Sequence, residues 1–275
     1  MEKNKTDINR RQFIKSGVVS VTALAALGAG VGYLKKLHSA NARTSEHLRP
    51  PGAIDEDDFI YGCIKCGLCV QICPIDAIHL AGISQGLSYS TPYINVREQA
   101  CDFSCDSLQC VETCPTAVLD FKQYEEAGGN AITEYQKNHD VSDPSFNPFN
   151  VQIRAMKEEV KMGIAKLNMN TCLAVKGKGF SGTPRGTDFT GIYRSPDGSE
   201  KKASPLRDKE FNREICDLCV TECPIGEKAI VMDNNARAFK PNVLDGCTGC
   251  GVCVMVCPTE TPSIIVEPLN QESHV

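Results

Sequence analysis

A hexapeptide that recurs four times constrains this chain more than any other feature of its sequence. Each copy reads Cys-Val-x-x-Cys-Pro, and the copies begin at Cys69, Cys110, Cys219 and Cys253. Two more cysteines precede the first and last copies, so that residues 63–74 and 247–258 both read Cys-x2-Cys-x2-Cys-x3-Cys-Pro. The fold must therefore bring several thiols together within single short loops.

This spacing is that of the bacterial iron–sulfur run, in which three thiolates lie on one loop and the fourth follows a helical turn. The second group is looser and reads Cys-x3-Cys-x4-Cys-x3-Cys over residues 101–114. The third group has only three closely spaced cysteines, and the isolated Cys172 supplies a fourth. We interpret Cys172 as the first ligand of that group, displaced by an insertion over residues 173–215. All 16 cysteines then fall into four groups of four.

In two-cluster ferredoxins the last cysteine of each run binds the cluster of the other run. Carried over to this chain, that rule predicts four [4Fe-4S] clusters. The expected ligands are Cys63, Cys66, Cys69 and Cys114 at site 1, and Cys101, Cys105, Cys110 and Cys73 at site 2. They are Cys172, Cys216, Cys219 and Cys257 at site 3, and Cys247, Cys250, Cys253 and Cys223 at site 4.

The predicted fold class is α+β: two tandem bacterial-ferredoxin-like dicluster modules, rich in loops, with short helices and β-hairpins around the clusters. The modules are expected over residues 55–125 and 164–275. Short strands are predicted at residues 77–80 and 93–96 in the first module. In the second module we predict a hairpin of 229–232 with 238–241 and a closing strand at 264–266.

Residues 126–163 are predicted to form a linker that contains a helix. The segment from Phe121 to Phe149 is polar and reads as a connection, not a domain. Apolar residues from Val151 to Ile164 then follow a helical period, and Arg154 and Glu158 are spaced to pair on that helix.

The insertion over residues 173–215 carries nine Lys/Arg against six Asp/Glu, in a body that is otherwise acidic. It contains a formal Gly-x-Gly-x-x-Gly at residues 177–182. The Thr-Pro-Arg-Gly that follows does not suit the start of a long helix, as a dinucleotide site requires. We expect a surface loop.

The amino terminus resembles a twin-arginine export signal. Arg10 and Arg11 precede an uncharged stretch over residues 16–34, and Ala40-Asn41-Ala42 offers a cleavage site after Ala42. We therefore expect residues 1–42 to direct the chain to the periplasm, with retention as a membrane anchor as the alternative. This route suits iron–sulfur ligands, because an oxidising compartment would pair free cysteines before clusters were inserted.

The charge distribution excludes some partners. Residues 1–42 carry seven Lys/Arg and two Asp/Glu. The rest of the chain carries 22 Lys/Arg and 32 Asp/Glu, which gives it a net charge of −10. Such an acidic body argues against nucleic acid and favours a basic redox partner or a membrane subunit with a basic face.

Two other interpretations of the cysteines are a zinc protein and a disulfide-stabilised exported protein. Zinc sites usually use two separated Cys-x2-4-Cys pairs, whereas each run here crowds four cysteines into one segment that ends in Cys-Pro. Neither H-E-x-x-H nor a Walker-A loop occurs in the sequence. We expect electron transfer, with no catalytic site of the chain's own.

Taken together, Arg10-Arg11, the four hexapeptides, the spacing after Cys101 and the isolated Cys172 resemble the NapG/MauM family of ferredoxin-type proteins. The resemblance implies a periplasmic or membrane-associated carrier of four [4Fe-4S] clusters, the electron-transfer component of a quinol dehydrogenase. Its implied partners are a membrane quinol-oxidising ferredoxin-type subunit and a c-type cytochrome or terminal reductase, leading to periplasmic nitrate reductase. Membrane association would come through that partner or through an uncleaved signal.

Two related functions stay open at this point. MauM-type members of the family are linked to methylamine oxidation instead. The iron–sulfur subunit of another exported molybdenum oxidoreductase is a further alternative, although those subunits generally keep Cys-x2-Cys openings where this chain has Cys101-x3-Cys105.

Overall fold

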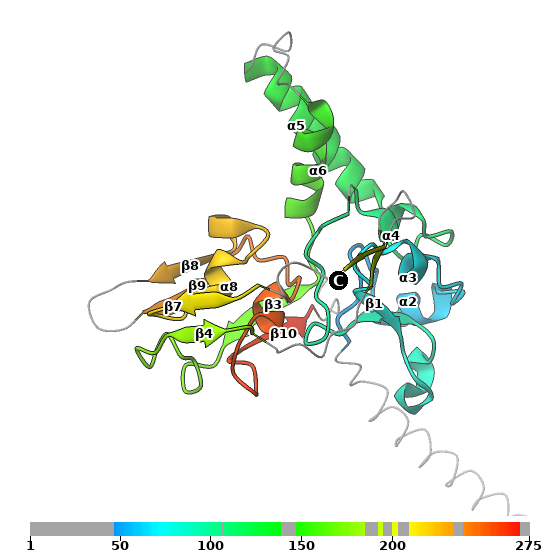
Figure 1. Ribbon diagram of the computed structural model, residues 1–275. Coiled ribbons are helices and arrows are strands. Elements are labelled where there is room, and N and C mark those ends of the chain that lie inside the picture. The colour runs from blue at the N-terminus through cyan, green and yellow to red at the C-terminus, as the bar shows by residue number, and fades with distance from the viewer. Residues whose placement is uncertain are drawn as a thin grey trace, which may run out of the picture. The chain divides into compact units, whose positions relative to one another are not determined.

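The computed structural model describes residues 47–105, 107–138, 147–184, 192–194, 200–202, 209–233 and 239–269. The predicted export signal, including Arg10 and Arg11, lies outside these residues. Within them the chain forms short helices and small sheets, and every sheet is a two-stranded antiparallel ribbon (Figure 1). The predicted α+β, loop-rich class is confirmed. None of the described helices has the length and apolar character needed to span a bilayer.

The first part of the fold surrounds the first two cysteine runs. It comprises α2 (Glu56–Gly62), α3 (Leu68–Ile72), β1 (Ile78–Leu80), the 3-10 helix η1 (Ile83–Ser88), β2 (Pro92–Ile94) and α4 (Gln109–Glu112). Strands β1 and β2 pair antiparallel, with Ile78 opposite Ile94. The strand predicted at 77–80 is confirmed.

The strand predicted at 93–96 is displaced, because β2 ends at Ile94. Asn95 begins a turn there: its carbonyl accepts from the backbone N–H groups of Glu98 and Gln99, and its side chain accepts from that of Arg97. These bonds satisfy the backbone locally and stop the strand.

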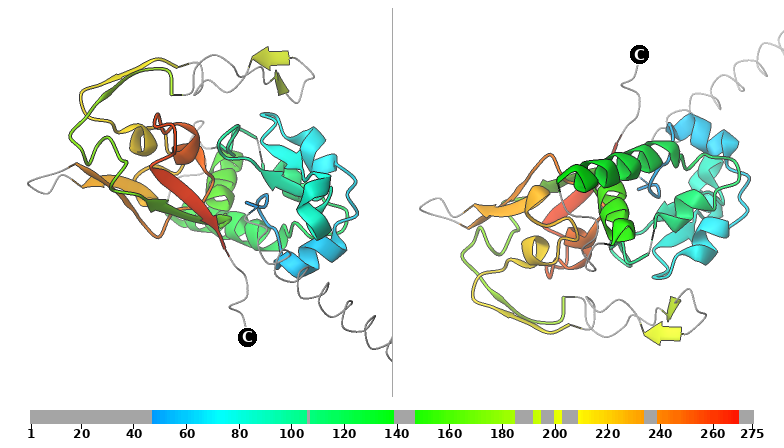
Figure 2. Two further views of the ribbon diagram at one scale, coloured as in Figure 1. Left: turned by 90° about the horizontal axis from the view of Figure 1, so that it is seen from below. Right: turned by 90° about the horizontal axis from the view of Figure 1, so that it is seen from above.

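Two helices connect the halves: α5 (Lys122–Asn138) and α6 (Pro148–Glu158), which lie side by side in Figures 1 and 2. The polar connection predicted from Phe121 to Phe149 thus contains a 17-residue helix that the sequence pattern did not indicate. Gly128 permits the close approach, since a Cβ there would lie 2.6 Å from Gln152 Cγ.

Helix α6 is shorter than predicted. Asn147 caps it by accepting from the N–H groups of Phe149 and Asn150, and Pro148 occupies its first turn. Met156 and Val160 are buried as the helical period predicts, but Ile164 lies beyond the helix in β3. The predicted pairing of Glu158 with Arg154 is replaced by an ion pair with Lys228, at 2.6 Å.

The second half begins with β3 (Gly163–Leu167) and closes with β10 (Ile264–Pro268), which pair antiparallel. Between them lie α8 (Leu218–Thr221), η2 (Gly226–Lys228), β8 (Ile230–Asp233), β9 (Lys240–Val243) and α9 (Val252–Met255). The predicted closing strand and the predicted hairpin, now β8–β9, are confirmed.

The described residues of the insertion over 173–215, which we expected to be a surface loop, include four short strands. Strand β4 (Phe180–Gly182) pairs with β7 (Phe211–Arg213), and β5 (Ile192–Arg194) pairs with β6 (Glu200–Lys202). Residues 180–182 of the glycine-rich segment form strand β4, whereas a dinucleotide-binding loop opens a helix at that position.

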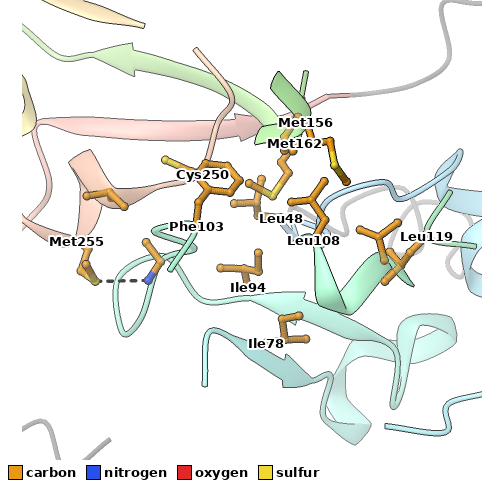
Figure 3. Packing of buried hydrophobic residues seen from close by; sticks show 14 of the residues in the cluster. Leu48, Ile78, Ile94, Phe103, Leu108, Leu119, Met156, Met162, Cys250 and Met255 are labelled. Carbon is orange, nitrogen blue, oxygen red and sulfur yellow. Dashed lines mark hydrogen bonds between the residues drawn. The ribbon is translucent and has the colours of Figure 1, made fainter. Parts of the chain in front are cut away.

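One large buried cluster joins both halves and helix α6. It includes Leu48, Leu108 and Ile94 from the first half, Met156 and Met162 from the connection, and Cys250 and Met255 from the second half (Figure 3). A smaller cluster, around Ile230 and Ile264, belongs to the second half alone. The two halves are therefore packed on a shared core.

Candidate metal centres

Four small cavities are each lined by four cysteines, and together these cavities account for all sixteen. Cys63, Cys66, Cys69 and Cys114 line one, and Cys73, Cys101, Cys105 and Cys110 line the next. Cys172, Cys216, Cys219 and Cys257 line a third, and Cys223, Cys247, Cys250 and Cys253 line the fourth. These are the four sets expected for sites 1 to 4, so the structure brings each set together. All sixteen side chains are free thiols.

A short helix separates the cysteines of each hexapeptide. Helices α3, α4, α8 and α9 each contain the first of the two, and the second follows the helix immediately before a proline. Helix α3 packs against α4, and α8 packs against α9. The two cysteines of a hexapeptide thus lie at opposite ends of a helical turn and face different cavities, which gives the crossed arrangement.

Two glycines shape the loops of the complete runs. Gly67 (φ +75°) lies between Cys66 and α3, and Gly251 (φ +85°) holds the same position between Cys250 and α9. This left-handed conformation turns the loop into the helix and is costly for residues with a Cβ. A Cβ on Gly251 would also lie 2.2 Å from Val96 Cγ1 of the first half.

Burial raises the pKa of most of the thiols, and the neighbouring thiolates of the same cavity raise it further. The pKa of Cys69 rises to about 12 through burial and then through the charges of Cys63, Cys66 and Cys114. Burial and the charges of Cys105, Cys110 and Cys73 hold the pKa of Cys101 well above its usual value. Four such thiolates need a compensating cation, which an iron–sulfur core supplies.

The second half repeats this electrostatic pattern. The pKa of Cys216 rises to about 11, through burial first and then the charges of Cys257 and Cys172. The pKa of Cys250 rises to about 12 through burial and the charges of Cys223 and Cys247.

Hydrogen bonds reach the sulfurs of three closing cysteines. The backbone N–H of Ala77 donates to Cys73 Sγ at 3.3 Å, and that of Ser263 donates to Cys257 Sγ at 3.2 Å. Thr116 Oγ1 lies 3.8 Å from Cys114 Sγ. Hydrogen bonds of this kind tune the reduction potential of a bound cluster.

Two lysines lie against cluster loops, and sequence reasoning missed both. Lys157 Nζ donates to the carbonyl oxygens of Phe103 (2.5 Å) and Cys105 (2.9 Å). Its charge opposes the rise that burial imposes on the Cys105 pKa. Lys161 Nζ donates to the carbonyl oxygens of Asp245 (2.7 Å) and Cys247 (3.1 Å). Nothing in the sequence next to these two lysines, in the linker helix and the turn after it, indicates that they bind the cluster loops.

The donor set fits an iron–sulfur cluster. Each cavity offers four thiols in largely apolar surroundings, which is the ligand count and type of a [4Fe-4S] centre. Over the described part of the chain, no three His, Cys, Asp or Glu side chains converge closely enough to hold a single metal ion. Each set of thiols instead surrounds a space.

Known proteins share these features. A family model for the 4Fe-4S dicluster domain matches residues 62–118, and one for the 4Fe-4S binding domain matches residues 243–263. The ferredoxin-type protein NapG of Escherichia coli (strain K12) is 31% identical, over 97% of this chain and 88% of the relative. The chain belongs to the NapG/MauM family of ferredoxin-type proteins.

Other members cover similar lengths. The methylamine utilization ferredoxin-type protein MauM of Methylorubrum extorquens is 30% identical over 94% of this chain and 89% of its own. NapG of Haemophilus influenzae is 28% identical over 98% of this chain and 75% of the relative's length. No solved structure matches the chain.

Membership of the NapG/MauM family decides between the classes of protein considered above. The chain is a ferredoxin-type iron–sulfur protein that transfers electrons and binds 4Fe-4S clusters. The zinc-stabilised and disulfide-stabilised alternatives are therefore set aside.

Proposed function

We propose that this protein carries four [4Fe-4S] clusters in two tandem dicluster modules. In this proposal it passes single electrons from a membrane quinol-oxidising subunit towards periplasmic nitrate reductase, through a c-type cytochrome. The observation that carries the proposal is the set of four cavities, each lined by four thiols drawn from two cysteine runs. The ligands are those given above for sites 1 to 4.

The surroundings of the cavities support a carrier that stores and passes electrons. Apolar residues such as Leu68, Ile78, Leu167 and Val266 line them beside the thiols. When bound, a cluster supplies the one-electron chemistry. The chain supplies burial, hydrogen bonds to sulfur and nearby lysine charges, which are the means by which proteins set cluster potentials.

The proposed partners follow from the family and from charge. Relatives named NapG support the nitrate route, and relatives named for methylamine utilization support a second candidate, transfer in methylamine oxidation. The body after residue 42 has a net charge of −10, before any cluster charge is added. That charge favours docking of a basic face of a redox partner and disfavours nucleic acid.

The proposed location is the periplasm, reached by twin-arginine export of the folded and cluster-loaded protein. Support comes from Arg10-Arg11 and from sixteen free thiols, which an oxidising compartment would otherwise pair. The signal is either cleaved after Ala42 or retained, holding the protein at the membrane.

Anaerobic purification tests the cluster content. The expected product is brown, contains iron and acid-labile sulfide for four [4Fe-4S] clusters, and shows four reducible centres in quantitative electron paramagnetic resonance. A colourless, zinc-loaded protein would contradict the proposal. Stoichiometric iron for only two clusters would overturn the proposed number.

Deletion of the gene tests the proposed route. Quinol-dependent nitrate reduction by intact cells should fall and recover on complementation, while nitrate reduction with an artificial electron donor should be unchanged. If methylamine oxidation falls instead, the second candidate function is supported and the nitrate route is overturned.

A further inference from the structure

The two halves of the molecule meet between the loop at residues 95–103 and helix α9 with its flanking turns. Arg97 donates to the carbonyl oxygens of Val254 (2.8 Å), Cys257 (2.8 Å) and Thr259 (2.7 Å). The backbone N–H of Ala100 donates to Met255 Sδ at 3.4 Å, the bond drawn dashed in Figure 3. The halves are thus held in register close to cysteine ligands of both modules.

Site 2 borders this junction from the first half. Phe103 lines the site 2 cavity and is 5% exposed. It belongs to the same buried cluster as Cys250, a site 4 cysteine, and Figure 3 labels both residues. Phe103 has φ +57°, a costly conformation for a bulky residue, and the bond from Lys157 to its carbonyl holds it there.

Site 4 borders the junction from the second half. Gly249 and Gly251 both line its cavity. A Cβ on Gly249 would lie 2.3 Å from Gly163 N, at the end of the connection, and one on Gly251 would meet Val96 of the first half. The wall of site 4 is therefore in close contact with the rest of the molecule.

The last turn of helix α6 and the residues after it contact the loops of both sites. Lys157 binds the site 2 loop through the carbonyls of Phe103 and Cys105, and Lys161, four residues later, binds the site 4 loop through those of Asp245 and Cys247. Two cations thus lie next to sites 2 and 4.

We propose that sites 2 and 4 are the inner pair of the relay, so that electrons follow the order 1–2–4–3 or its reverse. This inference rests on the proposed four clusters. In the crossing step a reduced site 2 cluster loses one electron and the oxidised site 4 cluster gains it, with no bond or proton changed. Site 1 is then an outer terminus, in accord with the exposure of Cys66 and of Ile64 on its loop.

A crossing from site 2 to site 3 is the alternative. Site 3 contributes Cys216 to the shared core, and Arg97 binds the Cys257 carbonyl. The Cys257 side chain packs in the separate cluster of the second half, but Cys223, Cys247 and Cys253 of site 4 pack against that cluster too, so it does not distinguish the two crossings. The contacts of Phe103, Gly251, Lys157 and Lys161 favour site 4.

Electron paramagnetic resonance of the full chain distinguishes the two orders. Cys247→Ser should disable site 4, and Cys172→Ser is the matched variant for site 3. In the fully reduced protein, Cys247→Ser should remove the spin–spin broadening that the second module imposes on the site 2 signal. Cys172→Ser should leave that broadening in place.

Loss of the broadening in Cys172→Ser but not in Cys247→Ser would overturn the proposed order. In that case the proposed function would still stand, provided that the wild type contained four clusters. Fewer than four clusters in the wild type would overturn both. Iron content and circular dichroism establish that each variant keeps its other clusters and its fold.

Phe103→Leu provides a second test if the cysteine variants do not fold. It keeps an apolar side chain but removes the aromatic ring that lines site 2 within the shared buried cluster. After one-electron reduction, freeze-quenched samples should show several-fold slower equilibration between the modules. Phe149→Leu, at an exposed position in the first turn of helix α6, is the control and should leave the rate unchanged. An unchanged rate in Phe103→Leu would contradict a crossing at this contact.

Discussion

At the scale of single residues, comparing the two glycines of the complete cysteine runs distinguishes the cost of backbone strain from the cost of a close contact. Gly67 and Gly251 hold the same position and the same left-handed conformation, at φ +75° and +85°. Nothing lies within 4 Å of a Cβ built on Gly67, whereas one on Gly251 would meet Val96 Cγ1 at 2.2 Å. The loop at Gly67 therefore has open space around it, whereas the loop at Gly251 is in close contact with the first half of the molecule.

Gly251→Ala should destabilise the protein more than Gly67→Ala. The left-handed conformation costs each alanine about 1–2 kcal/mol, and overpacking adds about 1–3 kcal/mol at position 251 only. Anaerobic denaturant titration of the cluster-loaded protein measures both variants. Equal losses of stability would show that the contact with Val96 relaxes without cost.

Lys157 is the cation whose removal should act on one cluster. Lys157→Gln should lower the reduction potential of site 2, because a positive charge near the site stabilises the reduced cluster. The expected shift is on the order of 1 kcal/mol, or about 40 mV for a one-electron couple. Lys166→Gln, which removes an exposed lysine paired with Glu267, should change no potential. A redox titration in which both variants behave alike would contradict this role.

At the scale of elements, the hairpin of α5 and α6 shows what the sequence could not predict. Helix α5 carries adjacent glycines, Gly128 and Gly129, and has a polar sequence, so its own propensity argues against a helix. Contact with α6 stabilises it, and the buried Tyr124 anchors its first turn. Tertiary packing of this kind leaves no periodic signal in a polar segment.

The two glycines of α5 should respond in opposite directions to the same substitution. Gly129→Ala should raise the stability by about 1 kcal/mol, since alanine favours the helix and nothing lies near its Cβ. Gly128→Ala should lower it, because the new Cβ would lie 2.6 Å from Gln152 Cγ and 3.2 Å from Met156 Cγ. Thermal unfolding midpoints compare the two. Stabilisation by both would mean that the helices can move apart freely.

The strands near the cysteine runs were more predictable than the helices. The β8–β9 hairpin and the closing strand β10 follow from short apolar runs bounded by turn residues. Strand β2 ends early because the turn at Asn95 depends on side-chain chemistry that an apolar pattern does not record. The four sets of cysteines were predicted by applying the crossing rule of two-cluster ferredoxins to the spacing of the runs. Phe103, Arg97 and Lys157 instead act through contacts between distant parts of the chain, which the sequence pattern does not show.

At the scale of the whole molecule, the shared core makes the two halves one structural unit. The large buried cluster combines side chains of both halves with Met156 and Met162 of the connection. The chain also combines an amino terminus of net charge +5 with a body of net charge −10. That asymmetry suits a segment that engages an export machinery and a body that docks on basic redox partners.

The export prediction concerns the whole chain. Replacing Arg10 and Arg11 together with lysine preserves the charge but removes the paired arginines of the signal. The folded, cluster-loaded protein should then accumulate in the cytoplasm, as measured by cell fractionation and immunoblotting. Normal periplasmic delivery of this variant would rule out the twin-arginine assignment.

The crossed supply of ligands is the central claim, because it ties the runs into pairs and defines every site. Cys114 belongs by sequence to the second run, yet it lines the cavity with Cys63, Cys66 and Cys69. The most direct test is electron paramagnetic resonance of anaerobically purified Cys114→Ser. Its spectrum should show the site 1 cluster altered or lost and the other three intact. Damage to the cluster of Cys101, Cys105 and Cys110, with site 1 unchanged, would contradict the crossed arrangement.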